Sequence, residues 1–222
     1  MQEFKATNYL SPEDFDRFLL GFDKVNSYKA TIPLMKLCAN IQYFCALRIS
    51  EVLTLRRDDF DLKNRILTLS NTKTGFKKCK CSTWEKKKLV TSNDSCVKCE
   101  GLGKYRIKQY TTIPRPLIIE IGEHLKSMKQ NVLLFNFNRI TAWKYYKSAG
   151  KDLEIREQQE ERNIEGIWTH LLRSSYIKFM RENGASIELC AAKLRHKERT
   201  AVDHYLRVDL QAVITWEAKI FD

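Results

Sequence analysis

Six side chains with the chemistry to act on an anionic group occur in four short motifs. The motifs are Ala-Leu-Arg-Ile-Ser-Glu at 46–51, Thr-Lys-Thr-Gly at 72–75, His-Leu-Leu-Arg at 170–173, and Leu-Arg-His at 194–196 with a tyrosine nine residues later. Arginine forks bind anionic oxygens, histidine and lysine exchange protons, and tyrosine can serve as a nucleophile. Each motif alone has an ordinary structural explanation, but their joint occurrence indicates one site. The candidates are Arg48, Lys73, His170, Arg173, His196 and Tyr205.

Together the four motifs resemble the catalytic domain of the tyrosine recombinase (phage integrase) family. The resemblance runs from Tyr9 to about Val208, outside a long insert. One departure is Arg195, where the family usually has glycine. Another is the long insert immediately after Lys73.

The resemblance implies a site-specific DNA recombinase or integrase that cleaves and rejoins DNA through a 3′-phosphotyrosyl intermediate. Tyr205 would be the nucleophile, and because the pKa of a tyrosine phenol is ordinarily about 10, it needs a base or cationic neighbours. His170 is the candidate base, His196 a hydrogen-bonding partner of the phosphate, and Lys73 the proton donor to the leaving oxygen. The two arginines would bind the non-bridging oxygens, so catalysis needs no metal, ATP or other cofactor.

A second tyrosine competes for the role of nucleophile. Tyr176 lies three residues after Arg173 and so on the same helix face. A tyrosine in that position is more simply a packing residue, and Tyr205 is therefore preferred.

Four of the seven cysteines form a C-x-C and a C-x2-C pair separated by fourteen residues. Two close pairs of thiolates suit one tetrahedral structural zinc, and four sulfurs would leave no open position for catalysis. Metal would also fold a polar segment that has no core of its own. The alternative is a set of unconnected cysteines in a flexible loop. The predicted ligands are Cys79, Cys81, Cys96 and Cys99.

The charge of the chain is concentrated in the same segment. The net charge is +12, and residues 77–108 hold ten basic and three acidic residues. Such an excess favours an anionic partner, here double-stranded DNA, although lysines in a run can be plain solvated charge. The candidate DNA-binding residues are Lys77, Lys78, Lys80, Lys86, Lys87 and Lys88.

The pattern of elements predicts an α+β fold that is mostly helical, with a small three-stranded antiparallel sheet. Helices are expected from Ser11, over about 32–43, from about Ser50, and over about 139–146, 170–182 and 186–194. Strands are expected at about 65–70 and 110–113, and the connection between them would be the zinc-ribbon-like insert, 77–108, within a catalytic domain spanning 1–222. The charged stretch 151–162 is expected to be a solvated helix or loop.

Partners and alternatives complete the sequence-based picture. By resemblance, recombination needs four protomers on two duplexes, with a monomer possible when free. The apolar face of 209–222 could dock on a neighbouring protomer or equally on its own domain. Without an apolar span or export signal, the chain is expected to be intracellular and free of membranes. The alternatives are a type IB topoisomerase and a zinc-ribbon DNA-binding protein that lacks catalysis.

Overall fold

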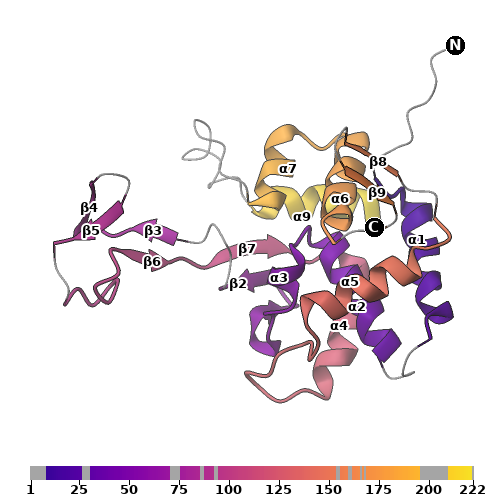
Figure 1. Cartoon of the computed structure of the whole chain (residues 1–222), viewed down its shortest axis with the longest axis horizontal. Coiled ribbons are helices and arrows are strands. Elements are labelled where there is room, and N and C mark those ends of the chain that lie inside the picture. The colour runs from indigo at the N-terminus through magenta and orange to yellow at the C-terminus, as the bar shows by residue number, and fades with distance from the viewer. Residues whose placement is uncertain are drawn as a thin grey trace, which may run out of the picture.

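The computed structural model describes residues 9–26, 31–70, 76–85, 88–92, 95–153, 156–159, 162–165, 167, 169–195 and 210–221. A helical body carries a small sheet, and a narrow β-rich segment projects from it (Figure 1). The helices are α1 (Pro12–Gly21), α2 (Thr31–Phe44), α3 (Ile49–Val52), α4 (Arg115–Lys126), α5 (Arg139–Ala149), α6 (Leu171–Glu182), α7 (Ile187–Leu194) and α9 (Leu210–Phe221). The strands are β1 (Phe60–Asp61), β2 (Ile66–Leu69), β3 (Phe76–Lys78), β4 (Ser82–Glu85), β5 (Lys88–Thr91), β6 (Lys104–Arg106), β7 (Gln109–Thr112), β8 (Arg156–Gln159) and β9 (Arg162–Glu165).

Local sequence explains why α1 begins where it does. The Ser11 hydroxyl accepts a hydrogen bond from the Asp14 backbone N–H at 3.1 Å, and Pro12 occupies the first helical position. Phe15 and Phe18 then lie on the buried face. The predicted start of this helix is confirmed.

The core of the helical body is aromatic. The Phe15 ring stacks on Tyr43 of α2 with centroids 3.9 Å apart. The Phe18 ring meets Tyr146 of α5 edge-on at 5.5 Å, and Tyr43 meets Tyr176 of α6 at 5.5 Å. These contacts join α1, α2, α5 and α6 into one packed unit, which includes the helix that carries Arg173.

The three-stranded antiparallel sheet is confirmed, in the order β1-β2-β7. The register pairs Ile66 with Thr112 and Leu69 with Gln109. Because β2 and β7 are neighbours in the sheet, the residues between them must leave the body and return. They do so as the projecting segment (Figure 1), in which β3 pairs with β6 and β4 pairs with β5.

The expectation of a solvated helix or loop over 151–162 is wrong for part of that stretch. β8 and β9 form an antiparallel hairpin with Arg156 opposite Glu165 and Gln159 opposite Arg162. The backbone N–H and C=O groups pair whatever the side chains are, so a charged sequence does not exclude a two-stranded ribbon.

The C-terminal helix packs on its own domain. α9 contacts α4, α7 and β7, with Val213 1% exposed and Trp216 packed against the core. Of the two possibilities for this apolar face, the structure therefore has the intramolecular one. Within the described part of the chain, no helix is long and apolar enough to cross a membrane.

Candidate active site

Arg48 and Glu51 meet at the start of α3. Glu51 is the third helical residue, so its side chain reaches back to the residue that precedes the helix. Its Oε2 accepts the Arg48 backbone N–H at 2.8 Å, and its Oε1 accepts the Arg48 Nη1 donor at 2.9 Å. The Arg48 side chain remains 25% exposed while Glu51 is 2% exposed, so the guanidinium is both anchored and accessible.

Arg173 reaches the same carboxylate from α6. Its Nη1 lies 3.4 Å from Glu51 Oε2, and its Nη2 donates to the Leu194 carbonyl at 2.7 Å. The side chain is 1% exposed. The two arginines predicted from separate motifs thus come together in the structure.

Arg195 is a third guanidinium at this carboxylate, and sequence reasoning gave it no role. Its Nη2 lies 2.8 Å from Glu51 Oε2, with the side chain 5% exposed. It ends α7 with φ 54° and ψ 33°, in the left-handed region. Glu51 and Arg195 both lie within motifs identified in the sequence. Their place in these motifs is the feature of the sequence that points to them.

The charges at the site shift one another's pKa. Burial would raise the pKa of Glu51, but Arg195, the Arg48 backbone N–H and Arg173 outweigh it and hold that pKa below its ordinary value. Burial, together with Arg195 and Arg48, lowers the pKa of Arg173 to about 9. The site at neutral pH is therefore an ionised carboxylate surrounded by three cations.

His170 stands at the N-terminal end of α6, beside this cluster. The buried Gln42 amide donates to the carbonyl of the preceding residue, Thr169, and so ties this turn to α2. Partial burial, followed by the positive charges of Arg173 and Arg48, lowers the pKa of His170 below its ordinary 6.5. The imidazole is consequently neutral at pH 7, as a proton acceptor must be.

Three predicted residues, Lys73, His196 and Tyr205, lie outside the described residues. Of the predicted lysines, Lys86 and Lys87 also lie outside. Tyr176, the competing tyrosine, is fully buried and donates its hydroxyl to Glu217 Oε1 at 3.2 Å. It is a packing residue, as expected.

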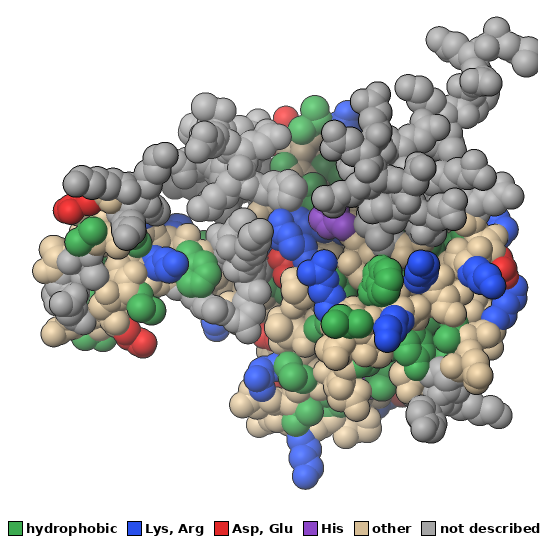
Figure 2. All heavy atoms as spheres, viewed as in Figure 1, with side chains coloured by type: hydrophobic (Ala, Val, Ile, Leu, Met, Phe, Trp, Pro, Cys, Tyr) green, Lys and Arg blue, Asp and Glu red, His purple; other side chains and the backbone are tan. Residues whose placement is uncertain are grey.

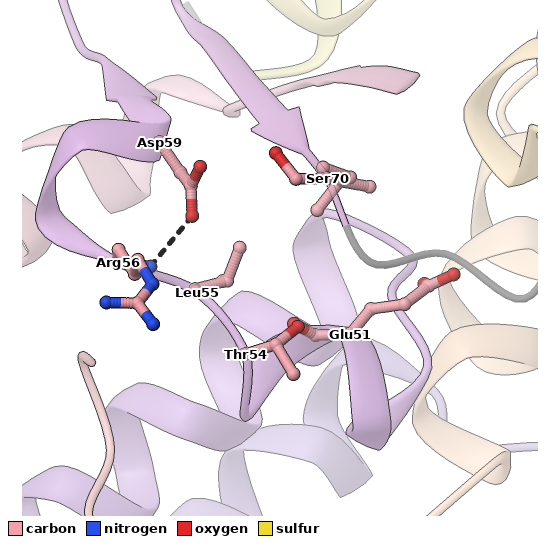
Figure 3. A pocket seen from close by; sticks show the side chains of 7 residues that line it. Glu51, Thr54, Leu55, Arg56, Asp59 and Ser70 are labelled. Atoms are coloured by element: carbon pink, nitrogen blue, oxygen red, sulfur yellow. Dashed lines mark hydrogen bonds between the residues drawn. The ribbon is translucent and has the colours of Figure 1, made fainter. Parts of the chain in front are cut away.

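A small pocket of about 120 Å³ lies beside Glu51, between α3 and the end of β2. Figure 3 shows Glu51 extending on the side away from Arg56 and Asp59. The Arg56 backbone N–H donates to Asp59 at 2.8 Å, so these two groups satisfy each other. The pocket is smaller than the usual range of ligand sites, and the candidate site is instead the surface at the accessible Arg48 guanidinium and the His170 imidazole.

The four predicted zinc ligands come together in the projecting segment. Their sulfurs all lie within 4.8 Å of one another, with Cys79 and Cys96 at 3.7 Å and Cys81 and Cys99 at 3.4 Å. A tetrahedral zinc with Zn–S bonds of about 2.3 Å places its sulfurs about 3.8 Å apart. A hydrogen bond with Cys81 contributes most to lowering the pKa of Cys96 to about 7, and this favours the thiolate form. The donor set and its spacing therefore fit one metal ion.

The other cysteines behave as small apolar residues. Cys38 and Cys45 are 0% exposed and Cys190 is 5% exposed. Burial raises the pKa of Cys38 and of Cys45 to about 12. All three therefore serve as packing residues of the helical body.

A second buried ionic cluster holds α9 in place, and the sequence analysis missed it. Lys193 Nζ of α7 lies 2.5 Å from Glu217 Oε1 of α9, and both side chains are 0% exposed. Thr112 of β7 donates its hydroxyl to the same oxygen at 3.0 Å. The cluster thus joins the C-terminal helix to the helix that precedes His196 in the chain.

These elements are those of a tyrosine recombinase catalytic domain, and the comparisons with known proteins agree. The chain belongs to the phage integrase family, whose family profile matches residues 9–212. No curated protein is similar enough to count as a match.

Three solved structures illustrate the shared fold. The XerA recombinase is 15% identical with a TM-score of 0.57, and the match covers 98% of this chain and 66% of that one. The XerH site-specific recombinase bound to a palindromic difH substrate is 19% identical with a TM-score of 0.57, covering 99% and 54%. The catalytic domain of bacteriophage HP1 integrase is 18% identical with a TM-score of 0.51, covering 93% of each chain. At such identities the likeness establishes the fold, and this chain spans at most two thirds of the two longer proteins.

Proposed function

We propose that this chain is the catalytic domain of a site-specific DNA recombinase or integrase that works through a 3′-phosphotyrosyl intermediate. The observation that carries the proposal is the meeting of Arg48 and Arg173 on one buried carboxylate, beside a histidine whose pKa is lowered. Membership of the phage integrase family supports the same activity. The partner would be double-stranded DNA, in keeping with the relative described as bound to its difH substrate.

The reaction follows from the chemistry of these groups. The Tyr205 hydroxyl attacks the scissile phosphorus, and its proton passes to His170. Arg48 and Arg173 bind the non-bridging oxygens, whose charge grows in the pentacoordinate transition state. The bond to the 5′-oxygen breaks, and Lys73 supplies that oxygen with a proton while His196 hydrogen-bonds the phosphate. The phosphotyrosyl bond retains the energy of the broken bond, so rejoining is the same steps in reverse and needs no ATP.

A covalent-trap experiment tests this function. Nicked duplexes of random sequence lose a short fragment on cleavage and leave the protein attached to the 3′ end. We expect a protein–DNA adduct with the parent chain and none with Tyr205→Phe. Tyr176→Phe is the matched control, because that hydroxyl is buried against Glu217. Absence of any adduct at any DNA end would contradict the proposal.

The two arginines should act on the transition state more than on binding. Arg48→Ala and Arg173→Ala are each expected to lower cleavage by roughly 100- to 1,000-fold, in line with the loss of one preorganised charge. DNA affinity, measured by gel shift, should fall much less. A loss of affinity as large as the loss of rate would contradict a transition-state role.

The same experiment separates the alternatives. A type IB topoisomerase forms the same kind of adduct but relaxes supercoiled DNA without exchanging partners, so exchange between two labelled duplexes would exclude it. A zinc-ribbon protein without catalysis would shift DNA in a gel yet form no adduct. Recombination itself is proposed to need four protomers on two duplexes, whereas the free protein can be a monomer.

We also propose that Cys79, Cys81, Cys96 and Cys99 hold one structural zinc. The sulfur spacing supports a tetrahedral ion, and four ligands leave it no open position. Metal analysis should find about one zinc per chain, released by a chelator or by Cys96→Ser. Cys190→Ser is the matched control, since that cysteine lies in the helical body. Finding no metal in the freshly purified protein would contradict this site.

Lysines around the metal are proposed to contact the DNA backbone. Lys77, Lys78 and Lys80 are exposed on and next to β3, which supports that role for them. Figure 2 shows basic side chains both on the projecting segment and on the helical body. The same role is proposed for Lys86, Lys87 and Lys88.

A further inference from the structure

Arg195 adopts a backbone conformation that suits glycine better. Its φ of 54° is in the left-handed region, where any residue with a side chain has an energetic cost that glycine lacks. Glycine would close the helix at this position without that cost. An arginine here is therefore expected to have compensating contacts.

Those contacts lead to the carboxylate that anchors both predicted catalytic arginines. The Arg195 side chain is 5% exposed, with Nη2 2.8 Å from Glu51 Oε2 and Nη1 donating to the Lys193 carbonyl at 3.1 Å. The same Glu51 oxygen lies 3.4 Å from Arg173 Nη1. Arg195 thus makes the shorter contact with Glu51, and Arg173 the longer one.

The backbone at this helix end is part of the same network. Arg173 Nη2 donates to the carbonyl of Leu194, the residue directly before Arg195, at 2.7 Å. One end of the Arg173 fork therefore rests on the backbone next to Arg195 and the other on the carboxylate that Arg195 neutralises. A change of the Arg195 side chain therefore acts on Arg173 through the carboxylate that both residues contact.

Counting charges shows what Arg195 adds. Without it, one carboxylate would face Arg48 and Arg173, for a net charge of +1. With it, three guanidiniums surround one carboxylate and the net charge becomes +2. The additional charge is held away from water, where electrostatic interactions are least screened.

We propose that Arg195 is a positioning residue, which neutralises Glu51 so that Arg48 and Arg173 present their full charge to the scissile phosphate. It acts through Glu51, because its own side chain is buried. This role rests on the proposed function, since it concerns the same phosphate. It assigns to this arginine an electrostatic task that a glycine at the same position could not perform.

The test compares two substrates that differ in charge. The duplex captured by the covalent trap is prepared with the ordinary scissile phosphodiester and with a methylphosphonate, in which a methyl group replaces one charged oxygen. Arg195→Gly should lower cleavage of the phosphodiester by roughly 10- to 100-fold, as expected for loss of one preorganised charge. The deficit on the methylphosphonate should be at least about fivefold smaller, because less charge develops there.

Two further variants separate charge from folding. Arg195→Gln retains a polar side chain without the charge. Like Arg195→Gly, it should lose more rate on the phosphodiester than on the methylphosphonate. Arg195→Lys retains the charge and should recover most of the rate. Arg181→Gln removes an exposed arginine from α6 and serves as the control, with an unchanged ratio between the two substrates.

The results distinguish a failure of the role proposed for Arg195 from a failure of the proposed recombinase function. Equal deficits on both substrates would mean that Arg195 only supports the local fold, and the inference would be wrong. Cleavage as fast as the parent in Arg195→Gly would overturn it as well. If the parent chain itself forms no adduct with either substrate, the proposed function fails, and that result does not depend on Arg195.

Discussion

At the residue scale, the candidate site is organised by one buried carboxylate, that of Glu51. Glu51 contacts Arg48, Arg173 and Arg195, which come from the start of α3, from α6 and from the end of α7. Three like charges would repel one another without it. The buried carboxylate therefore stabilises both the fold and the arrangement of the three guanidiniums on which the proposed cleavage depends.

Glu51→Gln should consequently be costly. The change leaves buried guanidiniums without a counter-charge, and breaking a buried ion pair in this way costs about 3–5 kcal/mol. The free energy of unfolding, from urea titration, should fall by an amount in that range. Glu85→Gln, on an exposed strand residue of the projecting segment, is the control and should change little. A loss below about 1 kcal/mol for Glu51→Gln would contradict this account.

The same carboxylate gives the stability a predictable pH dependence. The pKa of Glu51 is lower in the folded protein than its ordinary 4.5. The folded state therefore binds fewer protons than the unfolded state in acid, so the stabilisation is present above about pH 4.5 and lost as the pH falls through the folded value. Glu51→Gln should flatten this part of the curve of unfolding free energy against pH. A curve that keeps the parent slope would show that other groups dominate.

Protonation of His170 should cause the fall of the cleavage rate at acid pH, that is, the acid limb of the pH–rate profile. A base works only when unprotonated, and burial with two neighbouring arginines lowers the pKa of His170 below 6.5. The rate of adduct formation should therefore begin to fall at a lower pH than it would for an ordinary imidazole, with the midpoint of the fall below pH 6.5. His170→Gln should lower the rate by roughly 100-fold or more and remove the limb. His124→Gln on α4 is the control, and an acid limb that persists in His170→Gln would assign it to another group.

The motifs predicted that Arg48, Arg173 and His170 belong to one site, and the structure brings these three residues together near Glu51. The motifs did not predict the groups that hold them there. Glu51 and Arg195 belong to two different motifs and are 144 residues apart, and nothing in the sequence indicates that their side chains are in contact. Such a contact depends on how α3 and α7 pack, and one sequence carries no direct record of that packing.

At the scale of elements, the sequence was most informative where a helix has a clear start and a buried face. The helix expected from Ser11 is α1, which the Ser11 side chain caps and which buries Phe15 and Phe18. The charged stretch at 151–162 was misjudged, because charge reports exposure and not backbone conformation. The pairing of β8 with β9 arises from hydrogen bonds that every residue type other than proline can make.

The C-terminal helix offers a test of how an element is held. Lys193 and Glu217 form a buried pair between α7 and α9, and neither was predicted to matter. Glu217→Leu should cost about 3–5 kcal/mol because it leaves the buried Lys193 ammonium with only Thr112 as a partner and no counter-charge. The double variant Lys193→Met with Glu217→Leu should recover part of that loss, since the ammonium is then absent, although Arg65, 3.5 Å from Glu217 and 16% exposed, still loses its carboxylate. Urea unfolding of both single variants and the double variant measures the coupling, and simple additivity would contradict the pairing.

At the scale of the whole molecule, positive charge is divided between the helical body and the projecting segment. Residues 77–108 contribute +7 of the net +12, and most of them extend away from the helical body on the strands β3 to β6 (Figure 1). The guanidinium cluster lies in the body, at the level of α3, α6 and α7. A duplex held by both would span the distance between them, so the projecting segment would add to affinity without taking part in the chemical step.

The salt dependence of DNA binding can separate these two contributions. Each phosphate contact that a lysine makes adds about 0.9 to the slope of log affinity against log salt concentration. Lys78→Gln with Lys80→Gln should therefore lower that slope by roughly 1 to 2, measured by gel shift or fluorescence anisotropy over a salt series. Lys126→Gln with Lys129→Gln is the matched control, because these lysines lie at the end of α4 and just beyond it, on the other side of the body from α6 and α7 (Figure 1). The cleavage rate of DNA already bound should be unchanged in both pairs. An equal change of slope in both pairs would mean that the charge acts as a general field, and that the projecting segment has no particular contact with the duplex.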